Sequence, residues 1–117
     1  MAAQYQPIIE QAYAAFNRRD TDAVLALMHP DVHWPKAFEG DFVFGHENVR
    51  EYWTRQWSEI NPCVEPTGFE ERPDGTLAVD VHQVVKDMQG AVLMDGQTKH
   101  VYTFENGLIK AMNIEPA

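Results

Sequence analysis

The hydrophobic pattern of the chain changes its period once, near Cys63, and this change constrains the fold more than any other feature. Upstream, apolar residues recur three and four positions apart, as in Ile9, Tyr13 and Phe16, which is typical of an amphipathic helix. Downstream, they alternate with polar residues, which is typical of strands with one buried face. Helices followed by a run of strands predict an α+β fold with an antiparallel meander rather than a parallel α/β fold.

Three helices are expected in the first half of the chain. The first covers residues 5–16. The second is short, runs over residues 21–28 with aspartates capping its start, and is ended by Pro30. The third covers residues 47–60 and is stopped by Pro62, because the residue before a proline avoids the helical conformation.

The second half of the chain predicts a sheet. Strands are expected at about residues 63–72, 76–87, 91–104 and 108–115, after a short strand at 32–34 and a second short strand or flap at 41–44. Asp74-Gly75 and Asn106-Gly107 are expected to form type I′ hairpin turns, in which both central residues have positive φ. Asp95-Gly96 is a turn or a bulge inside a long strand.

Length and charge limit the classes of function. The 117 residues fit a single domain over 1–117, and no apolar run is long enough to span a membrane. A formal net charge of −9 disfavours binding to nucleic acids and to anionic membranes. Cys63 is the only cysteine, so a disulfide within the chain is excluded. Together with a start that does not resemble a signal peptide, this favours a cytoplasmic location.

The alternation assigns each strand residue to a face of the sheet. Residues Leu77, Val79, Val81, Gln83 and Val85 are expected inside, with Thr98, His100, Tyr102 and Phe104 beside them and Met112 and Ile114 on the last strand. Gln83 and His100 are polar exceptions on an otherwise apolar face. A polar group in a core carries a desolvation cost, so a polar residue there without a structural need for it is a candidate for a functional site.

Four segments, in this order, resemble the nuclear transport factor 2-like superfamily in its SnoaL-like branch. They are residues 15–23, 29–34, 45–53 and 100–109. The resemblance covers nearly the whole chain and implies a cone-shaped, curved antiparallel sheet wrapped around three N-terminal helices, with a pocket at the open end. The fold occurs in isomerases, cyclases, epoxide hydrolases, dehydratases and binding proteins, so the fold alone does not indicate which of these functions the chain has.

The resemblance allows known chemistries to be compared with this sequence. The base, tyrosine and oxyanion acid of ketosteroid isomerases fall on Trp34, Ala12 and His100, so that constellation is absent. SnoaL-like cyclases place a histidine where this chain has His100, but their last-strand acid falls on Ile114. Limonene epoxide hydrolases need a carboxylate near the same last-strand position, so this chain lacks their acid as well. Glu115 is one residue away and points to the other face unless a bulge intervenes.

His100 is therefore the candidate for acid/base catalysis, because an imidazole titrates near neutral pH. The alternative is a buried neutral histidine hydrogen-bonded to a tyrosine or glutamine. The residues expected to bind a ligand are Trp34, Trp53, Gln83, Tyr102, Tyr13, Val81, Met112 and Ile114. Gln83 and Tyr13 have an alternative role in the core, and Trp57 is expected to pack there.

No cofactor and no metal is expected, because the chain lacks a Gly-rich phosphate loop and a zinc-binding helix. His29, Asp31 and His33 resemble a metal cluster, but Pro30 breaks the geometry between them. Asp80 and His82 resemble a dyad but fall on the outer face, where relatives often pack against a second subunit. A homodimer is expected through that face, with Val84, Val101 and His82 at the interface.

Three hypotheses follow. The first is a cofactor-free enzyme acting by acid/base chemistry on a small hydrophobic carbonyl compound or epoxide. The second is a protein that binds such a molecule without converting it, and the third is a dimerisation domain with a vestigial pocket. An open cavity of roughly 300 Å³ or more favours the first two, and a sealed one around His100 favours the third.

Overall fold

The structure is a computed structural model that describes residues 2–36 and 40–116. A 3₁₀ turn, Ala2–Tyr5, precedes three helices, α1 (Gln6–Asn17), α2 (Thr21–Leu25) and α3 (His46–Glu59). Six strands complete the chain: β1 (Met28–Pro35), β2 (Phe42–Phe44), β3 (Asn61–Glu71), β4 (Leu77–Lys86), β5 (Val92–Glu105) and β6 (Leu108–Pro116). The expected α+β class is confirmed.

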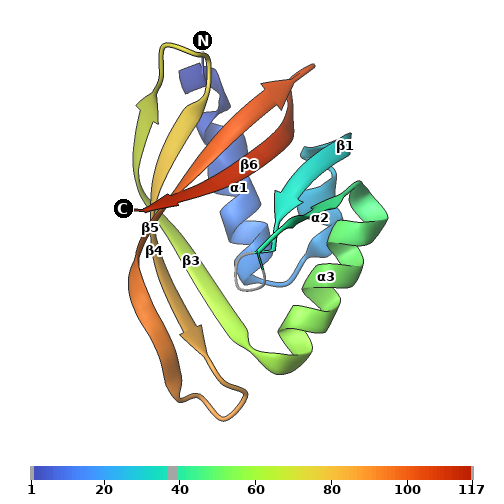
Figure 1. Cartoon of the computed structure of the whole chain (residues 1–117), viewed down its shortest axis with the longest axis vertical. Helices are drawn as coiled ribbons and strands as arrows, with labels where there is room; N and C mark the ends of the chain where they lie inside the picture. The colour runs from blue at the N-terminus through green and yellow to red at the C-terminus, as the bar shows by residue number, and fades with distance from the viewer. Residues whose placement is uncertain (1, 37–39, 117) are drawn as a thin grey trace.

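The helices lie against one face of a curved sheet. In Figure 1 the long strands β3 to β6 curve along one side of the molecule, α1 lies against them, and α3 lies on the side away from β4 and β5. Among the described residues, no helix has the length and apolar character needed to cross a bilayer.

The second helix is shorter than expected. Asp20 caps it by accepting a hydrogen bond from the backbone N–H of Ala23 at 3.2 Å. It ends at Leu25, so Met28 opens β1 instead of closing the helix, and Pro30 lies within that strand. Pro30 is tolerated there because the pairing of β1 with β6 is irregular between Met28 and His33, where a missing N–H breaks no regular ladder.

The strand order is β2-β1-β6-β5-β4-β3. The pairs from β6 to β3 are antiparallel, as expected for the meander. One pair differs from the expected antiparallel sheet, because β1 runs parallel to β6. These two strands are separated by most of the chain, so no local turn sets their relative direction.

The turns follow their local chemistry. Asn106 and Gly107 have φ of 54° and 79°, as a type I′ turn requires. At the β3–β4 turn only Gly75 has positive φ, so the type I′ prediction was wrong there. Pro73 has its φ restricted to negative values and favours a type I turn closed by the Gly75 N–H to Arg72 C=O bond of 3.0 Å. Asp95-Gly96 lies in regular register within β5.

The inner face of the sheet forms the core with the helices. Leu77, Val79, Val81 and Val85, all expected inside, have at most 3% of their surface exposed. The outer face differs from the expectation at Val101, which is only 6% exposed in the single chain and has little surface left to offer a second subunit. On this face Arg72, from the β3–β4 turn, forms a two-bond ion pair with Glu115 of β6.

Candidate functional site

Two adjoining cavities lie between the helices and the inner face of the sheet. Their volumes are about 60 Å³ and 50 Å³. Five residues line both: Phe16, Trp34, Trp53, Val64 and His100. The first is completed by Pro35, Tyr52, Gln56, Pro62, Gln83, Met112 and Ile114, and the second by Ala12, Tyr13, Val24 and Tyr102. A water needs about 10–15 Å³, so each cavity holds only a few waters in this conformation.

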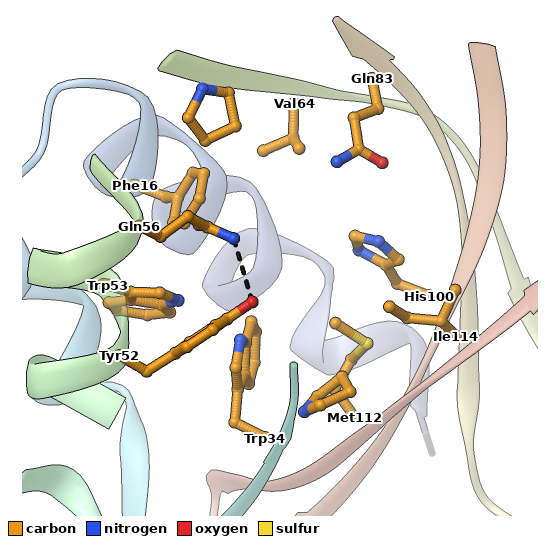
Figure 2. A pocket seen from close by; sticks show the side chains of 12 residues that line it. Phe16, Trp34, Tyr52, Trp53, Gln56, Val64, Gln83, His100, Met112 and Ile114 are labelled. Atoms are coloured by element: carbon orange, nitrogen blue, oxygen red, sulfur yellow. Dashed lines mark hydrogen bonds between the residues drawn. The ribbon is translucent and has the colours of Figure 1, made fainter. Parts of the chain in front are cut away.

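Aromatic rings form one wall of the first cavity. The indoles of Trp34 and Trp53 meet edge to face, with centroids 5.5 Å apart, and Phe16 contacts Trp53 in the same manner at 5.4 Å. These rings come from β1, α3 and α1, so packing between distant elements holds the wall in place. Figure 2 shows Phe16, Tyr52 and Trp53 on one side of the cavity, with Gln83, His100 and Ile114 opposite.

Two tyrosines hold His100 on the inner face. Nδ1 of His100 lies 2.7 Å from the hydroxyl of Tyr13, and the hydroxyl of Tyr102 donates to that of Tyr13 at 2.8 Å. The three residues are 7%, 5% and 1% exposed, respectively. The structure thus has the buried, tyrosine-bonded histidine that was the alternative to a catalytic one.

Burial keeps all three side chains uncharged near neutral pH. It lowers the pKa of His100 to about 4, because the charged imidazolium loses its hydration inside the protein. It raises the pKa of Tyr102, and it raises that of Tyr13 with a further contribution from the neighbouring Tyr102. With a pKa of about 4, the imidazole of His100 is a weak base at pH 7, which disfavours proton abstraction by this residue.

Two polar groups on the sheet side of the first cavity have free hydrogen-bonding capacity. Neither Nε2 of His100 nor the side-chain amide of Gln83 bonds to any described residue. The only fully buried polar side-chain atom without a partner in the described part of the chain is Nε1 of Trp57. Solvent therefore reaches Nε2 of His100 and the Gln83 amide through the cavity.

Seven of the eight residues expected to bind a ligand line one or both cavities. Trp34 and Trp53 line both, Gln83, Met112 and Ile114 line the first, and Tyr13 and Tyr102 line the second. Val81 was the exception: it is fully buried and lines neither, because its side chain packs in the core cluster. Trp57 packs against that cluster, as expected, beneath the guanidinium of Arg19.

Sequence reasoning missed part of the helix side of the first cavity. Tyr52 and Gln56 are one turn apart on α3, and the Gln56 amide donates to the Tyr52 hydroxyl at 3.0 Å (Figure 2). Pro35, Pro62 and Val64 were also missed. The spacing of Tyr52 and Gln56 beside Trp53 was a usable signal, since all three lie on one helical face.

The carboxylates near the site point away from it. Glu115 pairs with Arg72 on the outer face, and Asp95 pairs with His82 at 2.7 Å on the same side. Asp80 faces Lys99 instead of forming a dyad with His82. Among the described residues that line the two cavities, none is Asp or Glu.

The suspected metal cluster on β1 is not assembled. Nε2 of His29 pairs with Glu105 at 2.9 Å, and its Nδ1 accepts from the backbone of Asp31 at 3.0 Å. His33 packs edge to face on Phe44. The described residues contain no group of three or more side chains suited to hold a metal ion.

These features agree with the family that the sequence matches. The SnoaL-like domain family matches residues 9–112, which is most of the chain, so this protein belongs to that family. No match was found among curated proteins.

Solved structures show the same fold. TerC co-crystallised with polyporic acid is 25% identical, with a TM-score of 0.79, covering 93% of this chain and 88% of TerC. An NTF2-like protein of unknown function from Burkholderia pseudomallei is 26% identical, with a TM-score of 0.79 and coverage of 93% and 87%. RV0760c from Mycobacterium tuberculosis, in complex with estradiol-17beta-hemisuccinate, is 18% identical, with a TM-score of 0.77 and coverage of 99% and 91%.

Proposed function

We propose that the protein binds a small, flat, mostly apolar molecule in the cavities between α1, α3 and the sheet. One observation carries this proposal: an aromatic wall faces two polar groups, Nε2 of His100 and the Gln83 amide, that have no partner among the described residues. Solvent reaches both groups through the cavity, so a ligand that bonds to them replaces water there, and the aromatic wall beside them favours a mostly apolar ligand.

The cavity volumes limit the ligand. Both are far below the roughly 300 Å³ that favours an enzyme or a binding protein, so cavity volume by itself favours the third hypothesis, a dimerisation domain with a vestigial pocket. Ligand binding therefore requires side chains to move. Trp34 lines both cavities and is half-buried, and we propose that movement of its indole joins them. We therefore expect ligands of one or two rings to bind more tightly than larger ones.

Two structural neighbours support a role in binding. TerC was crystallised with polyporic acid and RV0760c with estradiol-17beta-hemisuccinate. Both proteins share the fold of this chain, so a small molecule is the class of partner that the comparison favours.

Cofactor-free acid/base catalysis on a carbonyl compound or epoxide is the second candidate. It is favoured by the position of His100, the only histidine among the described residues that line the cavities, on the strand before the Asn106-Gly107 turn. It is opposed by the low pKa of His100 and by the absence of a carboxylate from the described lining residues. Binding without turnover is therefore the function we favour.

The test is a thermal-shift screen of wild type and His100→Ala against single-ring carbonyl compounds, phenols, epoxides and steroids, with mass spectrometry on every hit. Ligands that stabilise wild type and remain unconverted support binding. Conversion that requires His100 supports the enzyme instead. Glu115→Gln is the matched control, because that carboxylate lies on the outer face. A library without any stabilising ligand argues against both candidates.

The homodimer and the cytoplasmic location remain predictions. The outer face offers Val84 and His82 to a partner, but Val101 is already buried and His82 already pairs with Asp95. Size-exclusion chromatography with light scattering tests the dimer, and a monomer at micromolar concentration contradicts it.

A further inference from the structure

We propose that Tyr102 and Tyr13 hold the proton of neutral His100 on Nε2, so that the site selects ligands presenting a hydrogen-bond acceptor, such as a carbonyl oxygen. The two tyrosines are positioning residues in this proposal, and His100 is the residue that contacts the ligand. The inference rests on the proposed binding function and specifies its ligand class.

The direction of the hydrogen bonds begins at Tyr102. Its side chain is 1% exposed, and Tyr13 is its only hydrogen-bonding partner among the described residues, at 2.8 Å. A buried hydroxyl proton without an acceptor is strongly unfavourable, so the Tyr102 proton must point to the oxygen of Tyr13.

Tyr13 then determines the state of His100. Its own hydroxyl proton is directed at Nδ1 of His100, 2.7 Å away, so Nδ1 acts as an acceptor and carries no proton. A neutral imidazole has one N–H, which must therefore be on Nε2. The reverse arrangement, with Nδ1–H donating to Tyr13 and Tyr13 donating to Tyr102, leaves the Tyr102 proton without an acceptor.

The environment keeps the imidazole neutral. His100 is 7% exposed, none of the described residues lining the cavities is a carboxylate, and burial places its pKa well below neutral. No anionic side chain there competes for the Nε2 proton. Gln83 carries both a donor and an acceptor in its amide and does not discriminate between ligands, so the selection falls to His100.

The tautomer can be measured without any ligand. Two-bond ¹H–¹⁵N correlation spectra distinguish protonated from unprotonated imidazole nitrogens, and His100→Gln identifies the His100 signals among the five histidines. We expect wild type to carry the proton on Nε2. In Tyr102→Phe the constraint on direction is gone, so the population with Nδ1 protonated rises. Tyr5→Phe is the matched control, because it also removes a tyrosine hydroxyl, and Tyr5 makes no hydrogen bond to Tyr13, Tyr102 or His100. Wild type protonated at Nδ1 overturns the proposal.

The ligand class is tested with acetophenone and α-methylstyrene, which have nearly the same shape but carry an oxygen and a methylene group, respectively, at the same position. Wild type is expected to bind the ketone roughly 2- to 12-fold more tightly, the effect of one hydrogen bond. The preference shrinks in Tyr102→Phe and persists in Tyr5→Phe.

The outcomes separate the two proposals. Equal affinity of wild type for both probes overturns the ligand class while the binding function stands. Binding of neither probe overturns both the ligand class and the binding of small ring compounds, and the tautomer spectrum still tests the relay on its own. The wild-type measurements decide the inference even if Tyr102→Phe fails to fold.

Discussion

The hydroxyl of Tyr13 lies 2.7 Å from Nδ1 of His100, although the two residues are 87 positions apart in the sequence. The contact joins α1 to β5 across the core, and Tyr102 adds a second bond to the same hydroxyl. Tyr13 is thus the central member of a three-residue buried network. A network of this kind stabilises the fold when every member is satisfied and destabilises it when one is removed.

We expect Tyr13→Phe to destabilise the protein more than Tyr102→Phe does. Loss of the Tyr13 hydroxyl leaves both His100 and Tyr102 without their partner, and each unsatisfied buried group costs about 1–3 kcal/mol. Loss of the Tyr102 hydroxyl leaves the bond between Tyr13 and His100 in place, so about 1 kcal/mol is expected. Urea denaturation with unchanged m-values measures the difference. Equal losses in the two variants would mean that the network does not act through Tyr13.

The buried imidazole predicts that stability falls as the pH is lowered from about 6.5 to about 4. The unfolded chain binds a proton at His100 near its ordinary pKa of 6.5, but the folded protein does so only near 4. Between these values the unfolded state binds more protons, so stability rises with pH through this window, by about 3 kcal/mol in total. Thermal melts across the window measure the slope.

His100→Gln is the comparison for the pH experiment. Glu115 and Asp74 also have lowered pKa values, from their hydrogen bonds with Arg72 and Thr76, and they lose stabilising interactions in acid. Both groups are present in the variant, so their contributions cancel, and the difference between the two pH profiles should contain only the contribution of His100. Profiles that run parallel from pH 6.5 to 4 would show that the imidazole is not desolvated in the native protein.

Much of the fold was predictable because its signals are local. Alternation placed Val79 and Val81 on the buried face, and the φ requirement of Asn106-Gly107 identified the last hairpin. The parallel pairing of β1 with β6 was not predictable, since it depends on how elements far apart in sequence pack together. The extended path through Pro30 likewise depends on an irregularity in that pairing.

The candidate site was predictable in part. Strand alternation identified Gln83 and His100 as polar groups on the inner face, and both line a cavity. On the helix side, periodicity places Tyr52 and Gln56 on the same face of α3 as Trp53, but the angle at which α3 crosses the sheet decides which residues of that face reach the cavity, so these two were missed. The same limit explains Val81: alternation gives the face of a residue but not its depth, and Val81 lies wholly in the core.

Trp34→Ala is expected to create a larger ligand cavity, because the indole lines both existing cavities. The variant should be less stable than wild type, as truncation of a large side chain in a packed site is. Benzene should then raise its melting temperature more than that of wild type, since apolar cavities bind such ligands. Trp57→Ala is the matched control, because Trp57 packs on the core without lining either cavity. A similar benzene effect in both alanine variants would contradict the assignment of Trp34.

Glu115 provides the last test, because a carboxylate beside Ile114 is the obvious substitute for the missing last-strand acid. In the structure both of its oxygens accept from Arg72 at 3.0 Å on the outer face. Glu115→Gln should therefore leave the affinity for any pocket ligand unchanged and lower the melting temperature slightly. The loss should be smaller at high salt, since part of the side-chain surface of both partners is exposed and the pair is screened. Arg72→Gln should show the same pattern, and the double variant should add little to either single one. Loss of ligand binding in Glu115→Gln but not in Arg72→Gln would place this carboxylate in the site after all, and with it the acid that the enzyme hypothesis lacks.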